Sequence, residues 1–142
     1  MLVSALISWL TAQILKVFTG MFKDRQFDIV TLLFSTGGMP SSHSAAVCGL
    51  ATSAIVQYGV NSPYAAISII LAIVVMMDAS GVRYETGKQA KIINNIVKEI
   101  FSGDQYKLNT GLKELVGHTP FQVLMGAILG IAVAILLGIP ML

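Results

Sequence analysis

The chain has 142 residues, of which 55% are hydrophobic and only 11% are charged, with a formal net charge of +2. Its mean hydropathy is +0.78. Soluble domains carry about 25% charged residues, so this composition excludes an ordinary soluble protein, and the length allows one domain at most, residues 1–142. The scattered lysines give no support for nucleic-acid binding. We therefore expect an integral membrane protein whose surroundings are membrane lipids.

Four apolar segments, taken in chain order, predict transmembrane helices at about 1–22, 41–60, 62–82 and 119–141. Each is close to the ~20 residues that a helix needs to cross a hydrocarbon core of about 30 Å. The first segment lacks a basic start and contains Lys16, so we interpret it as a retained helix and not a signal peptide. The predicted fold class is all-α: an integral membrane helical bundle with about four transmembrane helices.

A polar region separates the third and fourth apolar segments. Within it, isoleucine and valine alternate with lysine and asparagine at helical spacing, which predicts an amphipathic helix at about 85–101. We expect this helix at the cytoplasmic interface, with its apolar face toward the lipid and its lysines forming a solvated face. A short second helix is expected at about 109–116.

Basic residues indicate the orientation of the chain. They stand between the first two and the last two apolar segments, whereas the turn at 59–63 has none. The positive-inside rule then places both charged segments in the cytoplasm and both termini outside. The predicted location is a bacterial-type plasma membrane.

The polar segment GGMPSSHSA, at residues 37–45, stands directly before the second apolar segment and holds His43, one of only two histidines. A helix start offers free N–H groups and the positive end of the helix dipole to an anion. A histidine with a pKa of about 6.5 can also deliver a proton at neutral pH. Either Ser41 or Ser42 simply caps the helix and His43 lies at the interface, or Ser41, Ser42 and His43 line an anion site.

The second histidine, His118, stands at the start of the fourth apolar segment. On the predicted topology both histidines lie at one membrane depth. This arrangement suits a phosphoryl transfer in which one histidine attacks phosphorus and the other protonates the leaving group. Three basic residues at the same depth would stabilise the phosphate oxygens, namely Lys16, Arg83 and Lys113.

Asp78 ends the third apolar segment at the same level. It either forms a structural ion pair with Arg83 or Lys16, or orients one histidine. Glu114, four residues before His118, is the rival orienting residue if the short helix continues. Histidines and carboxylates could also bind a metal, but the short spacings typical of metal sites are absent from the sequence, and the cations favour an anion. We therefore expect no metal and no other cofactor.

These motifs resemble the divergent branch of the type 2 phosphatidic acid phosphatase superfamily, which is related to acid phosphatases and vanadium-dependent haloperoxidases. The resemblance spans nearly the whole chain. It rests on Lys16, GGMPSSHSA at 37–45, DASGVR at 78–83 with GKQA at 87–90, and LKELVGHTP at 112–120. The better-studied members carry a Lys…Arg-Pro block, a Pro-Ser-Gly-His block and an Arg…His…Asp block. Their last histidine forms a phosphohistidine, their middle one is the general acid, and their basic residues hold phosphate.

The resemblance implies that His118 is the nucleophile, that His43 is the acid, and that Lys16 and Arg25 belong to the first block. It implies hydrolysis of a lipid phosphate or pyrophosphate through a phosphohistidine intermediate. The chain has fewer helices than the usual number in the family and so less wall around the site. A homodimer is therefore also expected.

Three departures from the family pattern support an alternative. Gln26 stands in place of proline, no arginine precedes His118 at the usual spacing, and Gln122 replaces the acidic residue that would orient His118. A neutral amide accepts a hydrogen bond but cannot stabilise an imidazolium as a carboxylate would. The alternative function is a non-hydrolytic protein that binds or transports a lipid phosphate and retains the architecture of the phosphate site.

Overall fold

The computed structural model describes residues 1–21, 39–100, 112 and 117–138, and these residues form helices and no strand. The helices are α1 (Leu2–Met21), α3 (Ser42–Tyr58), α4 (Pro63–Ser80), α5 (Val82–Ile100) and α6 (Pro120–Gly138). Each predicted apolar segment contains one helix, and the amphipathic helix is present as α5. The predicted all-α membrane bundle is confirmed. The short helix expected at about 109–116 lies outside the described residues, apart from Leu112.

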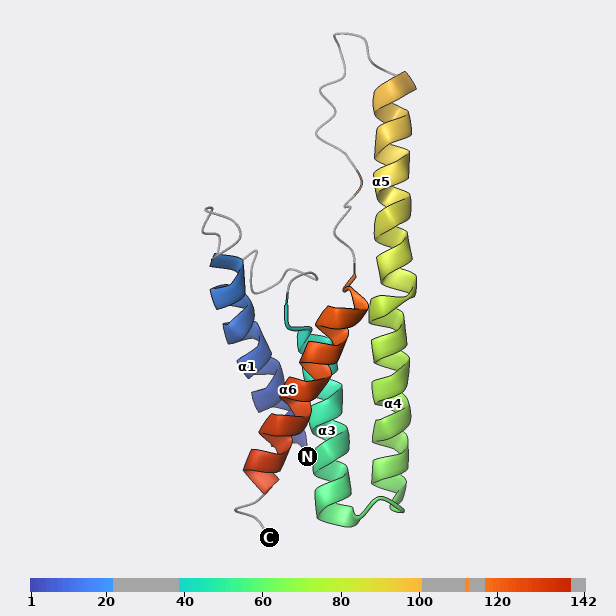
Figure 1. The fold of residues 1–142 in the computed structure, drawn as a ribbon. Helices are drawn as coiled ribbons and strands as arrows, with labels where there is room; N and C mark the ends of the chain where they lie inside the picture. The colour runs from blue at the N-terminus through green and yellow to red at the C-terminus, as the bar shows by residue number, and fades with distance from the viewer. Residues whose placement is uncertain (22–38, 101–111, 113–116, 139–142) are drawn as a thin grey trace.

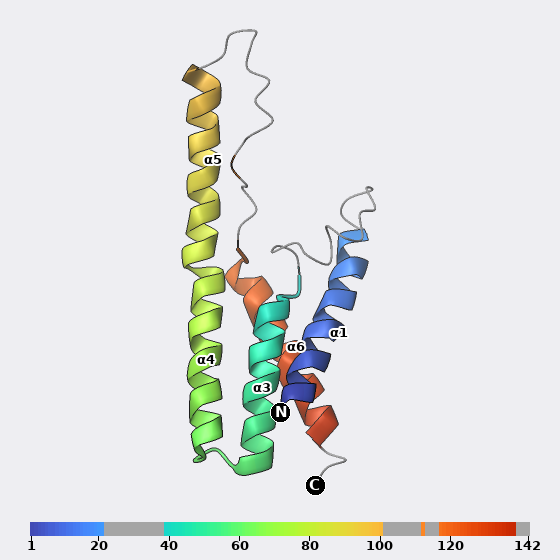
Figure 2. The same ribbon diagram turned by 180° about the vertical axis from the view of Figure 1, so that it is seen from behind.

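Helix α3 is the centre of the bundle. Helices α1, α4 and α6 all pack against it, and α1 also contacts α6. The chain runs in one direction along α1 and α4 and in the opposite direction along α3 and α6 (Figures 1 and 2). One end of the bundle therefore holds the end of α1, the α4–α5 junction and the starts of α3 and α6. The N-terminus and the turn between α3 and α4 lie at the other end (Figure 1).

Helices α3 and α6 approach each other closely through glycines. A Cβ atom added at Gly126 would lie 2.3 Å from the carbonyl oxygen of Ser41, and one at Gly130 would lie 2.2 Å from that of Ala45. These glycines form a Gly-x-x-x-Gly pattern, which lets helix backbones meet and gain van der Waals contact where lipid weakens the hydrophobic effect. The contact fixes the first turns of α6 against the first turns of α3.

Helix α1 packs on α3 through small polar side chains. Ser4 Oγ donates to Ser53 Oγ at 3.2 Å, and a Cβ atom at Gly49 would lie 2.4 Å from Ser8 Oγ. Ser4, Ser8 and Lys16 share one face of α1 because their spacing is a multiple of four. This buried face of α1 therefore leads directly to Lys16, which is only 2% exposed.

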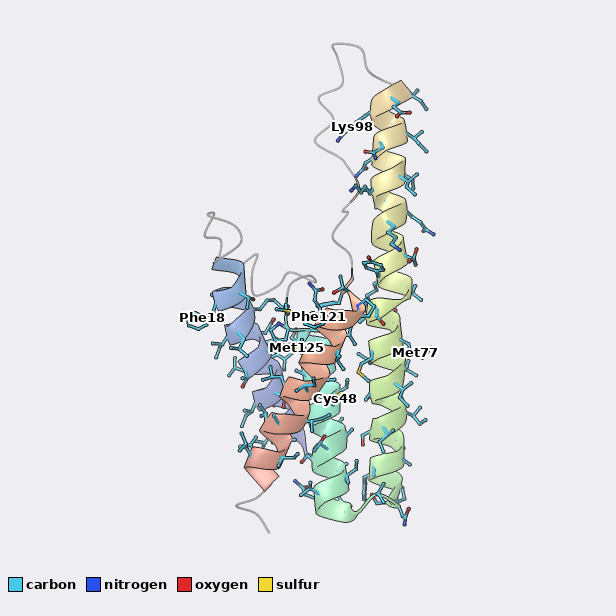
Figure 3. The ribbon with its side chains drawn as sticks, in the orientation of Figure 1. Phe18, Cys48, Met77, Lys98, Phe121 and Met125 are labelled. Atoms are coloured by element: carbon cyan, nitrogen blue, oxygen red, sulfur yellow. The ribbon has the colours of Figure 1, made fainter. Side chains whose placement is uncertain are left out.

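The outer surface of the bundle is apolar. Phe18 and Met77 point away from it (Figure 3) and are 56% and 68% exposed. Three helical stretches of the described chain, Leu2–Thr19, Pro63–Ile100 and Pro120–Gly138, are long and apolar enough to cross a membrane. The 17-residue α3 is at the short end of the range of about 17–25 residues for spanning helices. Its crossing stays a prediction.

Helix α5 runs on from α4 in nearly the same direction and extends beyond the other helices (Figures 1 and 2). Lys98 lies on this extension (Figure 3). The helix is amphipathic: Ile92 and Ile100 are 58% and 69% exposed, whereas Gly87 and Ala90 are buried. Its predicted position along the membrane interface stays a prediction, and a helix lying flat there would turn away from the direction of α4.

Candidate functional site

The polar end of the bundle holds the candidate site. The described residues that the sequence predicts for it are Lys16, Ser41, Ser42, His43, Asp78, Arg83, His118 and Gln122. They belong to the end of α1, the start of α3, the α4–α5 junction and the start of α6, which share this end (Figure 1). Segments far apart in the sequence therefore meet at one level, as expected from the topology.

The start of α3 is fixed by short polar side chains. Thr19 Oγ1 at the end of α1 donates to the carbonyl oxygen of Met39 at 2.6 Å. Ser41 Oγ accepts the Ser44 N–H at 3.4 Å and the Ser44 hydroxyl at 3.0 Å. Ser41 is therefore the N-cap of α3, and both it and Ser42 are buried. The first-turn N–H groups that no helical carbonyl accepts remain a favourable place for an anion.

The segment before α6 rests on the junction between α4 and α5. The His118 N–H donates to the carbonyl oxygen of Ala79 at 3.0 Å. Gly117 has a φ of +116°, and a Cβ atom there would lie 2.5 Å from the Tyr84 nitrogen. Only glycine combines this φ with so close an approach at little cost. The backbone on both sides of the Gly117–His118 peptide bond thus contacts the junction between α4 and α5.

Helix α6 begins with a capping box. Gln122 Oε1 accepts the Thr119 N–H at 2.9 Å, and Thr119 Oγ1 accepts the Gln122 N–H at 3.3 Å. This reciprocal pairing satisfies two backbone groups at the helix start. The carbonyl oxygen of Gln122 also accepts the Ser41 N–H at 3.1 Å. Gln122 therefore caps α6 and joins the starts of α3 and α6.

The two histidines face each other at these two helix starts. Their ring centroids are 6.3 Å apart and the rings are nearly perpendicular, at 80°. His43 is exposed, whereas His118 is only 3% exposed. The Nε2 atom of His118 is buried and has no hydrogen-bond partner among the described residues. Burying a polar atom without a partner costs free energy, so this nitrogen is a candidate for contact with a ligand.

Two basic residues of the described chain adjoin the histidines. Lys16 is buried on α1. Arg83 Nε donates to Asp78 Oδ2 at 2.5 Å, and both side chains of this ion pair are partly exposed. The ion pair corresponds to the structural alternative that the sequence left open for Asp78. Lys16 brings a positive charge to the buried side of this end of the bundle, close enough to lower the pKa of His118.

Burial lowers the pKa of His118 to about 4, and the positive charges of Lys16, His43 and Arg83 act in the same direction. His118 is therefore a neutral imidazole at neutral pH, with a lone pair that can attack an electrophile. Lys16 and Arg83 therefore add positive charge to the surroundings of His118.

Three predicted site residues, Arg25, Lys113 and Glu114, lie outside the described residues. Within the described part of the chain, no three His, Cys, Asp or Glu side chains are grouped to hold a metal ion. The hydrogen bonds described for the side chains of Asp78 and Gln122 go to Arg83 and Thr119.

Three residues that place the histidines were not among the predicted site residues: Gly117, Thr119 and Gly126. Thr-Pro-Phe-Gln at 119–122 matches the pattern of a capping box, in which a threonine precedes a glutamine by three residues. Gly126 and Gly130 form the Gly-x-x-x-Gly pattern of close helix pairs. Both signals were present in the sequence. The contact of Gly117 with α5 has no comparable local signal.

Residues 1–133 match the family described as the divergent PAP2 family. The chain is 38% identical over 147 residues to the uncharacterized membrane protein YuiD of Bacillus subtilis (strain 168), an alignment that covers 96% of this chain and 92% of the relative. No solved structure matches the chain. The apolar helices and the membrane protein relative agree that this is an integral membrane protein, and the chain belongs to the divergent PAP2 family.

Proposed function

We propose that the protein is a membrane phosphatase that hydrolyses a phosphomonoester or pyrophosphate of a lipid through a phosphohistidine at His118. The observation that carries this proposal is the juxtaposition of His43 and His118, with ring centroids 6.3 Å apart, beside the cations of Lys16 and Arg83. A phosphate bound between the two rings would meet a nucleophile on one side and a proton donor on the other.

The difference in exposure between the two histidines supports the proposed division of their roles. His118 is buried and its pKa is lowered to about 4, which suits a nucleophile that must be neutral. His43 is exposed and can exchange its proton with water, which suits a general acid that must be recharged in each cycle.

The reaction then has two balanced steps. A nitrogen of His118 attacks phosphorus as the bond between phosphorus and the lipid oxygen breaks, and the His43 imidazolium gives that oxygen its proton. Water next attacks the phosphohistidine, and His43 takes a proton from it. Inorganic phosphate leaves, and both histidines return to their starting states. The products are a lipid alcohol, or a lipid phosphate when the substrate is a pyrophosphate.

Positive charge supplies the stabilisation that phosphoryl transfer needs as negative charge spreads over the equatorial oxygens. We assign this role to Lys16, to Arg83 and to the first-turn N–H groups of α3 at Ser42. We propose that Arg25 and Lys113 also add positive charge to the site. Both lie outside the described residues. Asp78 holds Arg83 through their ion pair, and Glu114 stays a proposed orienting residue for His118.

The proposed setting is a bacterial-type plasma membrane, with the site on the cytoplasmic side and both termini outside. The positive-inside rule supports this orientation because the basic segments adjoin the site end of the bundle. The proposed partners are the lipid phosphate or pyrophosphate, the surrounding membrane lipids, and a second copy of the chain in a homodimer.

The second candidate is a non-hydrolytic protein that binds or transports a lipid phosphate. The use of Gln122 favours it: this side chain replaces the expected carboxylate and is bonded to Thr119. An imidazolium that forms during turnover would then lack a carboxylate from this position.

A phosphate-release assay on the purified protein separates the two functions. Diacylglycerol phosphate and a polyprenyl pyrophosphate are offered to the unaltered protein in lipid nanodiscs, and the protein is then examined by mass spectrometry for phosphate on His118. Phosphate release with a labelled His118 supports the hydrolase. Binding of both lipids with no release, in the unaltered protein and in Gln122→Glu, supports the non-hydrolytic function.

A further inference from the structure

Thr19 joins the end of α1 to the segment that enters α3. Its hydroxyl oxygen Oγ1 lies 2.6 Å from the carbonyl oxygen of Met39 and 3.1 Å from that of Lys16, and it donates to both. A hydroxyl has one proton to donate, so the two carbonyl oxygens share it. One side chain therefore links the backbone of Lys16, on α1, to the backbone of Met39, two residues before the N-cap of α3.

The Met39 carbonyl takes this partner because it lies outside the helix. The hydrogen bonds of α3 begin at Ser41, whose carbonyl oxygen accepts the Ala45 N–H at 3.0 Å. The carbonyl oxygen of Met39 precedes this first acceptor, so the helix offers it no donor. Thr19 supplies the donor from another helix, and the hydrogen bond is a tertiary contact between α1 and the entry to α3.

The start of α3 is itself fixed on α6. The Ser41 N–H donates to the carbonyl oxygen of Gln122 at 3.1 Å, and a Cβ atom added at Gly126 would lie 2.3 Å from the Ser41 carbonyl oxygen. The two helix starts that carry the histidines are therefore held together as one unit. The end of α1 is attached to this unit at Met39.

Another hydrogen bond between α1 and α3 lies far from Lys16. Ser4 bonds to Ser53 near the opposite end of the bundle (Figure 1), and twelve residues separate Ser4 from Lys16, which corresponds to about 18 Å of helix. Thr19 is three residues after Lys16, and residues at this spacing are neighbours on a helix surface. A displacement of the end of α1 would therefore carry Lys16 with it.

We propose that Thr19 is a positioning residue that holds Lys16 against the two histidines. The inference rests on the proposed function, because it takes the cation of Lys16 as a stabiliser of the bound phosphate. Burial lowers the pKa of His118, and the charges of Lys16, His43 and Arg83 lower it further, so the charge of Lys16 already acts at this place. Thr19 fixes where that charge stands and does not itself bind the phosphate.

A set of variants of the full-length protein in lipid nanodiscs tests this. Thr19→Val keeps the shape of the side chain and removes the hydroxyl, whereas Thr19→Ser keeps the hydroxyl. Lys16→Met removes the charge and is made alone and together with Thr19→Val. The matched control is Thr11→Val, because Thr11 Oγ1 donates at 2.7 Å to the carbonyl oxygen of Ile7 on its own helix and does not join two elements by that bond.

Phosphate release from a diacylglycerol phosphate gives kcat and KM. We expect Thr19→Val to lower kcat about 5- to 20-fold and to change KM less than threefold, because misplacing a reacting group costs rate more than binding. Thr19→Ser and Thr11→Val should stay within about twofold of the unaltered protein. Lys16→Met should lower kcat about 100-fold. Adding Thr19→Val to it should cost less than a further twofold, because both residues act through one charge.

The titration of the histidine rings is a readout that does not need turnover. The chain has two histidines, so NMR of protein labelled at histidine separates their pKa values. Besides each other, the charged groups that act on them are Lys16 on α1 and Asp78 and Arg83 at the α4–α5 junction. In Thr19→Val the pKa of His118 should rise from about 4, because the positive charge is no longer held near the ring. The serine variant and the matched control should leave it unchanged.

An equal loss of kcat from Thr19→Val with and without Lys16 would overturn the proposal, as would a loss in Thr19→Ser as large as that in Thr19→Val. If the unaltered protein releases no phosphate, the proposed function fails by itself and the titration decides the inference. In that case, a higher pKa of His118 in Thr19→Val alone supports the positioning of Lys16, and identical titrations in all the threonine variants refute it.

Discussion

The starts of α3 and α6 are two versions of one arrangement. Each has a histidine near a proline and a hydroxyl cap, and the Ser41 N–H donates to the carbonyl oxygen of Gln122 to join them. They differ in the place of the histidine. His43 is inside the first turn of α3 and is exposed, whereas His118 precedes the cap of α6 and is buried. The two histidines therefore differ by a few positions relative to the cap of their helix. The one after the cap is exposed to water, and the one before the cap is buried.

Replacing the buried member should have the largest effect. His118→Ala removes the proposed nucleophile, and we expect phosphate release to fall at least about a thousandfold, as it does when a covalent nucleophile is deleted. Initial rates on a lipid phosphate in nanodiscs measure this. Lipid binding should survive, because Lys16 and the start of α3 remain. Rates within tenfold of the unaltered protein would refute covalent catalysis at His118.

Replacing the exposed member should cost less, and the cost should depend on the leaving group. His43→Ala removes the proposed general acid, a contribution of about 10²- to 10⁴-fold. A lipid alkoxide needs the proton more than a phosphate leaving group does. We therefore expect a loss of about 100-fold or more for a phosphomonoester and a clearly smaller loss for a pyrophosphate. Equal losses for both substrates would contradict the acid role.

The pH dependence of the rate tests whether His118 is neutral. The pKa of His118 is lowered to about 4, so its lone pair is lost only when the pH falls through that value and not through 6.5. In His43→Ala the contribution of His43 is lost, but burial and the charges of Lys16 and Arg83 still lower the pKa of His118. The residual rate on a pyrophosphate should therefore be level from neutral pH down to about 5 and fall at lower pH. A fall already centred near 6.5 would show that His118 is not held neutral by its surroundings.

Much of this arrangement followed from the sequence because hydropathy and charge act along the chain. Apolar length indicated each helix, and the clustering of basic residues indicated that Lys16, His43, Arg83 and His118 share one end. Hydropathy cannot specify lateral order, because all outward faces of a membrane bundle are apolar. The central place of α3 therefore came only from the structure, as did the contact of Gly117 with α5.

The role of Gln122 shows a second limit of prediction from sequence, which concerns the role of a single residue. Motif comparison gave this position to an orienting acid, and its replacement by an amide pointed to lost function. The local pattern of threonine followed three residues later by glutamine describes a capping box equally well, and the structure contains that box. One position can belong to a family motif and to a helix cap at once, and only the contacts of its side chain distinguish the two uses.

The distance between the two helix starts can be disturbed through the glycine contact beneath them. In Gly130→Ala the new Cβ would lie 2.2 Å from a backbone oxygen of α3, which cannot move aside, and such overpacking costs about 1–3 kcal/mol. Gly138→Ala is the matched control, because there the nearest atom is 3.1 Å away in the Val56 side chain. Thermal unfolding in detergent should show a lower Tm for Gly130→Ala only. Identical Tm values would argue against close packing of α3 on α6.

The smallest effect is expected from Gln122→Glu. Glutamate at this position of a capping box accepts the Thr119 N–H as glutamine does, and negative charge near a helix start is favourable, so the Tm should not fall. The added carboxylate near His118 would raise the pKa of that histidine from about 4, while it remains bonded to Thr119. We therefore expect phosphate release to change less than tenfold at neutral pH. A rise of a hundredfold or more would mean that the carboxylate leaves the cap for His118. The natural glutamine would then hold back turnover, and the non-hydrolytic function would be favoured for the unaltered chain.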